Sequence, residues 1–314
     1  MSFQVTTAFV QQYKSNIYML AQQKGSRLRG MVRNETQQGK TAFYDQIGPT
    51  AAVKRTVRHG DTPLISTPHA RRAVTLSDYE WADLIDDQDK IRMLIDPASA
   101  YSMNAMNALG RGIDDEIIAA LLGTSFGSED GSLAIPLPAS QKLVPTTGAV
   151  VDKCNIGALL AIKKKFDDAD IDEDEERFLA LSSQQLQDLL GTTQVTSSDY
   201  NNVHALVQGK IDTYMGFKFI RTQRLPVGAA PTFDQTTGIV GAGANAMTNA
   251  RSVLAWAKSG VLLSVGDDME GRIDQRADKS YATQVYARMS VGATRLEEVK
   301  VVQCICKESS SVVS

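Results

Sequence analysis

The sequence has few of the residues from which catalytic and metal centres are built. Its three histidines, His59, His69 and His204, are scattered, and no pair of them has the spacing of a zinc site. No Cys-x-x-Cys occurs. The nearest match to a Gly-x-Ser-x-Gly nucleophile elbow, residues 127–131, has Glu129 in place of the serine. We therefore expect no catalytic residue, no metal site, no cofactor and no enzyme.

Long hydrophobic runs are also missing. No stretch approaches the roughly 18 apolar residues that a membrane-spanning helix needs, so we expect no membrane partner. Residues 1–14 lack the basic stretch and apolar core of a secretory signal. The three cysteines are Cys154, Cys304 and Cys306, and the last two would lie on the same face of a strand. Without a secretory signal, we expect these thiols to be reduced.

The charge is nearly balanced, at −3 over 314 residues, but it is unevenly distributed. Residues 1–77 carry a net +8, residues 78–200 a net −14 and residues 201–314 a net +3. This asymmetry favours head-to-tail pairing, in which the basic part of one copy docks on the acidic part of the next. The alternative is that both parts are ordinary solvated surfaces. The basic residues are not interleaved with stacking aromatics, so no nucleic-acid signature is present.

Three stretches resemble ligand-binding motifs but lack features that those motifs require. Residues 39–41 end like a phosphate loop but lack its first glycine and its preceding strand. Residues 241–246 resemble a dinucleotide fingerprint with too short a strand before them. Residues 168–174 resemble a calcium loop, but Glu173 and Leu179 replace the required glycine and glutamate. We interpret this acidic run as a solvated face, with weak non-specific cation binding as the alternative.

The distribution of apolar residues predicts an α+β fold of two domains or one elaborated domain, because short strands and helices lack a regular βαβ rhythm. An amphipathic helix is expected over 3–24. The longest helix is expected over 97–122, with an Asp96-Pro97 start, a stop at Gly123 and a bend marked by Gly110 and Gly112.

The second half is expected to hold shorter elements joined by glycine-rich connections. We predict helices over 155–169, 183–190 and 199–207, strands over 177–181 and 213–221, an apolar run over 253–265, two strands around Gly292 within 281–306, and surface connections over 123–148 and 226–248.

Residues 41–85 are rich in β-formers and predict a long hairpin with its tip near 59–69. The flanks of the tip are unusually basic, with Lys54, Arg55 and Arg58 on one side and Arg71 and Arg72 on the other. The tip has little alternating apolar content and cannot fold onto its own core. We therefore predict that the hairpin projects and that its basic residues contact another molecule.

Several unusual strings together resemble the major capsid proteins of tailed bacteriophages. The resemblance runs from about residue 10 to 306 and is weakest, a matter of pattern, over 125–250. It rests on residues 22–29, 58–63, 71–86, 96–97, 114–117, 276–280 and 292–295.

The resemblance implies an HK97-like capsid fold with a defined division of the chain. It assigns residues 1–40 to an N-terminal arm, 41–150 and 266–306 to a peripheral domain with an extended loop at about 48–76 and a spine helix at about 97–122, 151–265 to an axial domain, and 307–314 to a tail.

The resemblance also implies a structural function and a set of partners. The chain is expected to form hexamers and pentamers that close into an icosahedral virion shell around double-stranded DNA, which it binds without sequence specificity. Assembly would take place in the host bacterial cytoplasm with a separate scaffolding protein, a portal and a decoration protein. Lys54, Arg55, Arg58, Arg71 and Arg72 would meet acids of the adjacent subunit. The alternatives are an encapsulin-like nanocompartment subunit and, from another class, a soluble enzyme.

Overall fold

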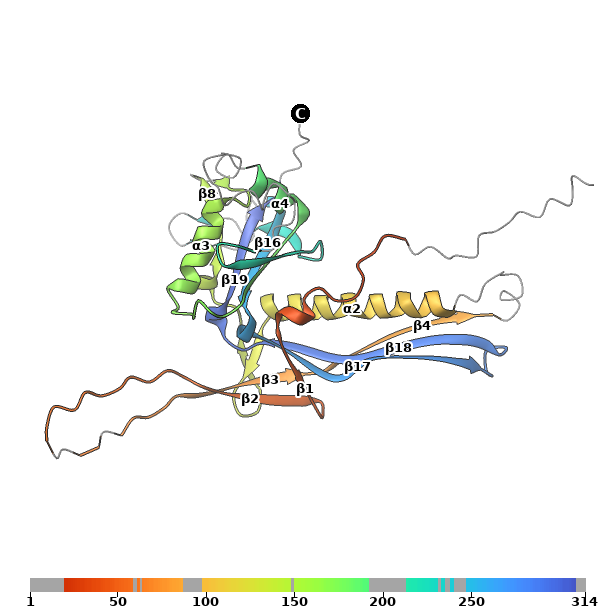
Figure 1. Ribbon diagram of the computed structural model, residues 1–314, viewed down its shortest axis with the longest axis horizontal. Coiled ribbons are helices and arrows are strands. Elements are labelled where there is room, and N and C mark those ends of the chain that lie inside the picture. Colours follow the sequence, from red (N-terminus) through yellow and green to blue (C-terminus); the bar gives the residue numbers. More distant parts are fainter. Residues whose placement is uncertain are drawn as a thin grey trace, which may run out of the picture. The chain divides into compact units, whose positions relative to one another are not determined.

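The computed structural model describes residues 20–58, 61–62, 64–86, 98–147, 150–191, 213–230, 233–234, 238–239 and 247–308 (Figure 1). It mixes helices with several sheets, so the predicted α+β class is confirmed. The chain divides into two compact units, one formed by residues 1–26, 78–112 and 267–290 and the other by 27–77, 113–266 and 291–314. The predicted arm, peripheral and axial boundaries differ from this division and stay predictions.

The first unit is built on long strands and a long helix. One sheet has the order β1-β17-β18-β4 and is formed by β1 (Arg33–Thr36), β17 (Val261–Arg276), β18 (Ala282–Arg295) and β4 (Ser77–Ile85). The first unit contains β4 from Asp78, β17 from Asp267, β18 as far as Ser290 and helix α2 (Ala98–Leu122) as far as Gly112, whereas β1 belongs to the second unit. Helix α2 packs on this sheet, because a side chain at Gly112 would meet Met289 of β18 and Tyr79 of β4. The predicted longest helix is therefore confirmed, and residues 87–97 before it lie outside the described part of the chain.

Gly110 serves a close approach of two chain segments. A Cβ atom there would lie 2.6 Å from the carbonyl carbon of Gly25, and the N–H of Gly25 donates to Oδ1 of Asn107 at 3.0 Å. Residues 20–24 have no helical structure, and Gln22 and Gln23 contact Arg111 of α2. The predicted end of the first helix at residue 24 is therefore wrong. Residues 3–19 of that predicted helix lie outside the described residues.

The second unit contains the largest sheet and the main core. Its strand order is β11-β12-β10-β16-β19-β7, with β13 paired to β16. These strands are β7 (Lys142–Leu143), β10 (Arg177–Leu181), β11 (Thr213–Tyr214), β12 (Phe217–Arg221), β13 (Val227–Ala230), β16 (Met247–Ala257) and β19 (Val301–Lys307). Helices α3 (Ile156–Asp167) and α4 (Ser183–Leu190) contribute buried side chains to the same core.

Local capping explains why the two short helices were predictable. The side chain of Asn155 accepts from the N–H of Ala158 at the start of α3. Ser182 and Gln185 form a reciprocal capping box at the start of α4. Both helices and strand 177–181 are confirmed. The predicted helix over 199–207 lies outside the described residues.

Three expectations for this half need correction. The strand predicted over 213–221 is split, because Met215 and Gly216 take positive φ values of 54° and 86° and reverse the chain. The run over 253–265 belongs to two strands, β16 and β17, separated by a 3-10 turn at Lys258–Gly260. Two strands are present within 281–306, β18 and β19, but they are separated after Arg295 and not at Gly292. Gly292 lies inside β18, where a side chain would collide with the carbonyl oxygen of Thr75.

The connection over 123–148 is more ordered than expected. It forms β5 (Ser125–Gly127) and β6 (Leu133–Ile135), which join β2 (Thr41–Ile47) and β3 (His69–Thr75) in a sheet of order β2-β3-β5-β6. The described residues also form several short elements: η2 (Arg29–Met31), η3 (Ala139–Gln141), β8 (Thr146–Thr147), β9 (Val150–Val151), β14 (Phe233–Asp234), β15 (Gly238–Ile239) and η6 (Glu298–Lys300).

The three cysteines are buried in the core of the second unit and are free. Cys304 and Cys306 lie on one face of β19, as predicted, with their sulfur atoms 3.7 Å apart. Hydrogen bonding to Cys306 and burial raise the pKa of Cys154 well above its ordinary value, so its thiol stays protonated. Among the described helices, none combines the length and the apolar character needed to span a membrane.

Candidate functional site

The predicted hairpin is present and carries a long exposed loop. Strands β2 and β3 pair antiparallel from Thr41 opposite Thr75 to Ile47 opposite His69. The N–H of Gly48 donates to the carbonyl of Pro68 at 2.9 Å and closes the loop at its base. Every described residue between 49 and 68 is exposed. The loop therefore gains almost nothing from packing against its own chain.

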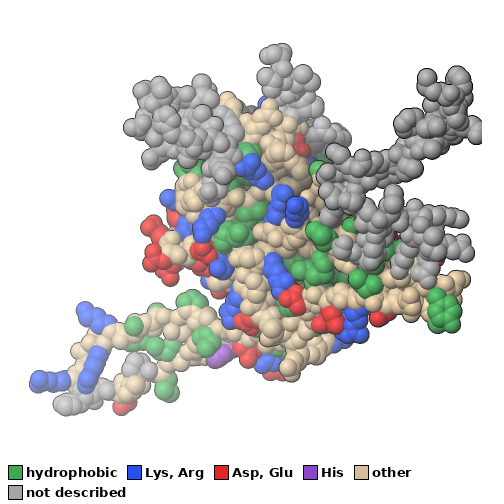
Figure 2. Space-filling model, turned by 45° about the vertical axis from the view of Figure 1, so that its right-hand side comes forward, with side chains coloured by type: hydrophobic (Ala, Val, Ile, Leu, Met, Phe, Trp, Pro, Cys, Tyr) green, Lys and Arg blue, Asp and Glu red, His purple; other side chains and the backbone are tan. Residues whose placement is uncertain are grey.

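The exposed side chains of this loop are a mixture of basic and apolar groups (Figure 2). Lys54, Arg55 and Arg58 have no carboxylate within ion-pairing distance in the described part of the chain, and Nε of Arg55 donates only to the carbonyl of Val57. The apolar side chains are Val53, Val57, Leu64 and Ile65, and Leu64 is 98% exposed. Cations without counter-charges next to exposed apolar side chains are typical of a protein-binding surface.

Arg71 lies in β3 and has partners in its own chain. Its Nε donates to Oδ1 of Asp45, directly across the strand pair, at 2.6 Å. Its guanidinium also lies 5.6 Å from the ring centre of Phe43. The hydrogen bond from Arg71 lowers the pKa of Asp45, which stays ionised at neutral pH. The pair is exposed, so it fixes the register of the hairpin more than it stabilises the fold.

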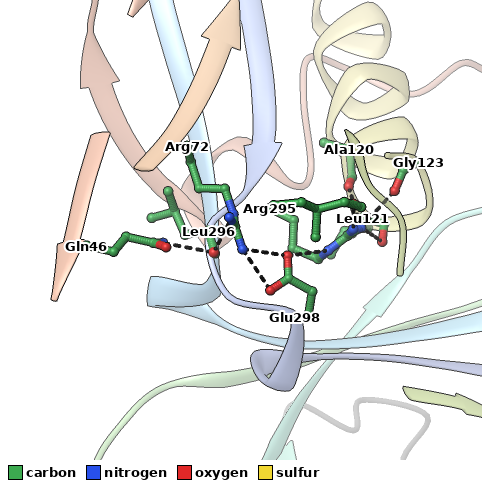
Figure 3. Close-up of polar contacts among 9 residues, drawn as sticks. Gln46, Arg72, Ala120, Leu121, Gly123, Arg295, Leu296 and Glu298 are labelled. Atoms are coloured by element: carbon green, nitrogen blue, oxygen red, sulfur yellow. Dashed lines mark hydrogen bonds and ion pairs between the residues drawn. The ribbon is translucent and has the colours of Figure 1, made fainter. Parts of the chain in front are cut away.

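Arg72 points to the opposite face of β3 and is buried at the base of the hairpin (Figure 3). Its Nη2 donates to both carboxylate oxygens of Glu298 at 2.9 Å, and its Nε donates to the carbonyl of Leu296 at 3.1 Å. Gln46 of β2 donates to the same carbonyl at 2.8 Å. Both strands of the hairpin are thereby attached to the segment between β18 and β19.

Arg295 extends this network to the end of helix α2 (Figure 3). Its side chain is fully buried. Its Nη1 donates to the carbonyl of Leu121 in the last turn of α2 at 3.0 Å and to that of Gly123, just after the helix, at 2.9 Å. Its Nη2 donates to the carbonyl of Ile135 at 3.0 Å. Burial lowers the pKa of Arg295, and Glu298, 3.9 Å from its Nε, opposes that shift.

The five residues predicted to contact another subunit therefore fall into two groups. Lys54, Arg55 and Arg58 have no ion-pair partner among the described residues, whereas Arg71 and Arg72 hold the hairpin together and attach it to its base. The prediction of inter-subunit contacts stays a prediction for all five. Sequence reasoning missed Glu298, because nothing local marks it as the counter-charge of an arginine 226 positions away.

The acidic run at 167–176 is partly neutralised within the chain. Asp167 pairs with the buried Arg177 at 3.1 Å, and Glu176 pairs with Lys218 and Lys258. Hydrogen bonds from these two lysines lower the pKa of Glu176 to about 2. No group of three or more metal-binding side chains occurs among the described residues. The glycine-rich motif at 241–246 lies outside them.

Comparisons with known proteins agree with one another. The family model described as phage capsid protein matches residues 5–308. The capsid of cyanophage P-SCSP1u superposes with a TM-score of 0.72 at 18% identity, covering 97% of this chain and 95% of that chain. The cyanophage Pam1 capsid gives 0.70 at 14% identity over 99% and 100%, and the Ralstonia phage GP4 capsid 0.70 at 9% over 98% and 97%. No curated protein matches. The predicted HK97-like capsid fold is confirmed.

Proposed function

Because the chain belongs to the phage capsid protein family and is a structural subunit of a capsid shell, we propose that it assembles through the loop at residues 48–68. In this proposal Lys54, Arg55 and Arg58 dock on acids of a neighbouring copy, and the exposed Val53, Val57, Leu64 and Ile65 side chains are covered at the same contact. The observation that carries the proposal is that three loop cations have no counter-charge among the described residues.

A loop of one copy on a different surface of the next is a heterologous contact, which generates a ring when the rotation closes. We infer that these rings are hexamers and pentamers and that they join into an icosahedral shell. Each contact can be weak, because a closed shell engages many of them at once. The anchor formed by Arg72, Glu298 and Arg295 supports this role, since it holds the base of the loop in a defined position before docking.

The finer parts of the proposal follow from the family. The shell would enclose double-stranded DNA without sequence specificity, and the chain would act with a scaffolding protein, a portal and a decoration protein after synthesis in the host bacterial cytoplasm. We propose no catalytic activity. No described feature favours the nanocompartment or the soluble enzyme as an alternative.

The test compares the unchanged chain with the triple reversal Lys54→Glu, Arg55→Glu and Arg58→Glu by size-exclusion chromatography and negative-stain electron microscopy. We expect rings or shells from the unchanged chain and only small species from the reversal, with the same melting temperature. The control exchanges the cations, Lys54→Arg, Arg55→Lys and Arg58→Lys, and should still assemble. Normal particles from the triple reversal would refute the docking role of the loop.

A further inference from the structure

Among the described residues, the second half of β17 is an unpaired sheet edge. Strand β1 pairs with β17 only from Leu262 to Val265. Beyond Gly266, β18 is the one partner of β17 within the described residues (Figure 1). Residues 271–275 are all exposed. An edge strand of this kind presents unpaired backbone N–H and C=O groups, to which another strand can add.

The side chains along this edge form an ordered row of charges. Glu270, Arg272, Asp274 and Arg276 alternate along the strand and therefore share one face. The last three line one hollow of about 340 Å³ together with Gln284 and Tyr286 of β18. Ile273, on the opposite face, is 51% exposed.

We propose that this edge pairs antiparallel with the same edge of a second copy of the chain, about a two-fold axis at Ile273. In that register Glu270 lies opposite Arg276 of the second copy and Arg272 lies opposite Asp274. The two-fold axis repeats both pairs, so every charge from Glu270 to Arg276 faces an opposite charge. The two Ile273 side chains meet at the axis and cover each other. Opposite charges directly across two strands stabilise the pairing.

Neighbouring registers lack this match. With the axis at Arg272, that residue faces itself and Glu270 faces Asp274. An axis at Asp274 puts that residue against itself and Arg272 against Arg276. Edge charges usually prevent pairing by repulsion. Here their order instead selects one self-complementary register, and the ladder ends at Arg276 because the chain turns over 277–280.

The pairs that these residues already make leave room for the second copy. Nη2 of Arg272 lies 2.8 Å from Glu270, which also pairs with Arg288 of β18 at 3.1 Å, and Nη2 of Arg276 lies 2.6 Å from Asp278. These pairs are exposed and contribute little to stability, so a second carboxylate or guanidinium can share them. Asp274 has no ion-pair partner among the described residues, which leaves its carboxylate available to Arg272 of the second copy.

This contact rests on the proposed assembly and adds a different kind of interface to it. Loop docking is heterologous and closes rings, whereas the edge pairing is isologous and joins one copy to one other. Rings must also be joined to one another to form a shell, and an isologous contact would do this. The second copy would therefore belong to a neighbouring ring.

The decisive experiment is a cross-link with Ile273→Cys in the full chain. A residue on a two-fold axis faces its own counterpart, with Cβ atoms about 5 Å apart, which is within reach of a disulfide. Copper(II)–phenanthroline accepts two electrons from the thiol pair, while the two protons go to the buffer, and it should give a disulfide-linked dimer on a non-reducing gel. The native cysteines are buried and should give little background. The control Gln275→Cys faces Gly271 of the second copy and lies about 14 Å from its own counterpart, so it should stay monomeric.

Charge exchange provides an independent measurement by light scattering and electron microscopy. Arg272→Asp alone and Asp274→Arg alone each create two like-charge pairs and should weaken the contact roughly tenfold or more. The double variant restores opposite charges and should assemble as the unchanged chain does. Asp86→Arg, an exposed position with the same charge change, is the control.

The outcomes separate the two proposals. Assembly of the unchanged chain without an Ile273→Cys dimer, or a double variant no better than the single ones, would overturn the edge contact and leave loop docking intact. A specific Ile273→Cys dimer together with normal particles from the loop reversal would support the edge contact and refute loop docking.

Discussion

Removing the carboxylate of Glu298 should weaken the attachment of the loop base to the rest of its unit. In Glu298→Ala, Nη2 of Arg72 loses both of its 2.9 Å hydrogen bonds to that carboxylate. Arg295, whose side chain is fully buried, loses the only carboxylate near it among the described residues, at 3.9 Å. Two guanidinium groups would then remain in the interior without a counter-charge.

The magnitude follows from this geometry. The Arg72 side chain is 9% exposed and that of Glu298 is 18% exposed, so solvent screens the pair only weakly. Breaking a buried ion pair by removing one partner costs about 3–5 kcal/mol, because the other charge stays buried. Water can reach the space that the shorter side chain leaves, so we expect about 3 kcal/mol for Glu298→Ala. Replacing Arg72 and Glu298 together should cost less than the sum of the single changes, by about 1.5–3 kcal/mol.

The assay is urea unfolding of the unassembled chain, with Glu297→Ala as the matched control. Glu297 is the neighbouring residue, is 46% exposed and pairs with Lys300 at 3.1 Å on the surface. Its removal should cost less than about 1 kcal/mol. Equal losses for the two variants, or strictly additive effects of the Arg72 and Glu298 changes, would refute the reasoning that this network anchors the hairpin.

Three further changes test separate parts of the fold. Gly110→Ala should cost about 1–3 kcal/mol in denaturant unfolding, because its Cβ would lie 2.6 Å from Gly25, whereas Gly30→Ala, with open space around it, is the control. Ser182→Ala should cost about 1 kcal/mol by the same measurement, since it removes a helix cap, and an unchanged midpoint would count against the cap. Burial raises the pKa of Asp188, so the folded protein binds a proton at this carboxyl more tightly than the unfolded protein does. The free energy of unfolding therefore falls as the pH rises above the pKa of about 4 that Asp188 has in the unfolded chain. Asp188→Asn should therefore raise the melting temperature at pH 7 and lose this advantage near pH 3. A variant that melts below the unchanged chain at pH 7 would contradict this direction.

Elements with signals in their own sequence were predictable. Ser182 and Gln185 specify the start of α4 through backbone and side-chain atoms three residues apart, and the structure follows that signal. Helix α2 has its apolar stripe and its glycine stop in one continuous stretch. The hairpin of β2 and β3 follows from β-forming residues on both sides of a turn-rich tip. In each case the decisive interactions connect residues close in sequence.

Features set by distant segments were not predictable. Gly292 looks like a turn residue, but Thr75, far away in sequence, explains it by leaving no room for a side chain. The connection over 123–148 contains glycine and proline, and still forms β5 and β6 because β3 offers an edge to pair with. Glu298 carries no local mark of its role. A single sequence does not show which segments meet, so these features required the structure.

The difference between Arg71 and Arg72 shows how the hairpin separates stability from assembly. Adjacent residues of a strand point to opposite faces, so one arginine reaches an exposed aspartate and the other a buried network. The amino-acid composition does not distinguish these two arginines. Replacing Arg72 by an acidic residue would therefore test the stability of the fold more than docking. Lys54, Arg55 and Arg58 do not have this double role, because no described contact of their side chains crosses to another part of the chain. If the loop docks as proposed, variants at these three positions should change the particle yield while the unfolding free energy stays within about 0.5 kcal/mol. A matching loss of both quantities would mean that the loop packs on its own chain, and the docking surface would then have to be sought elsewhere.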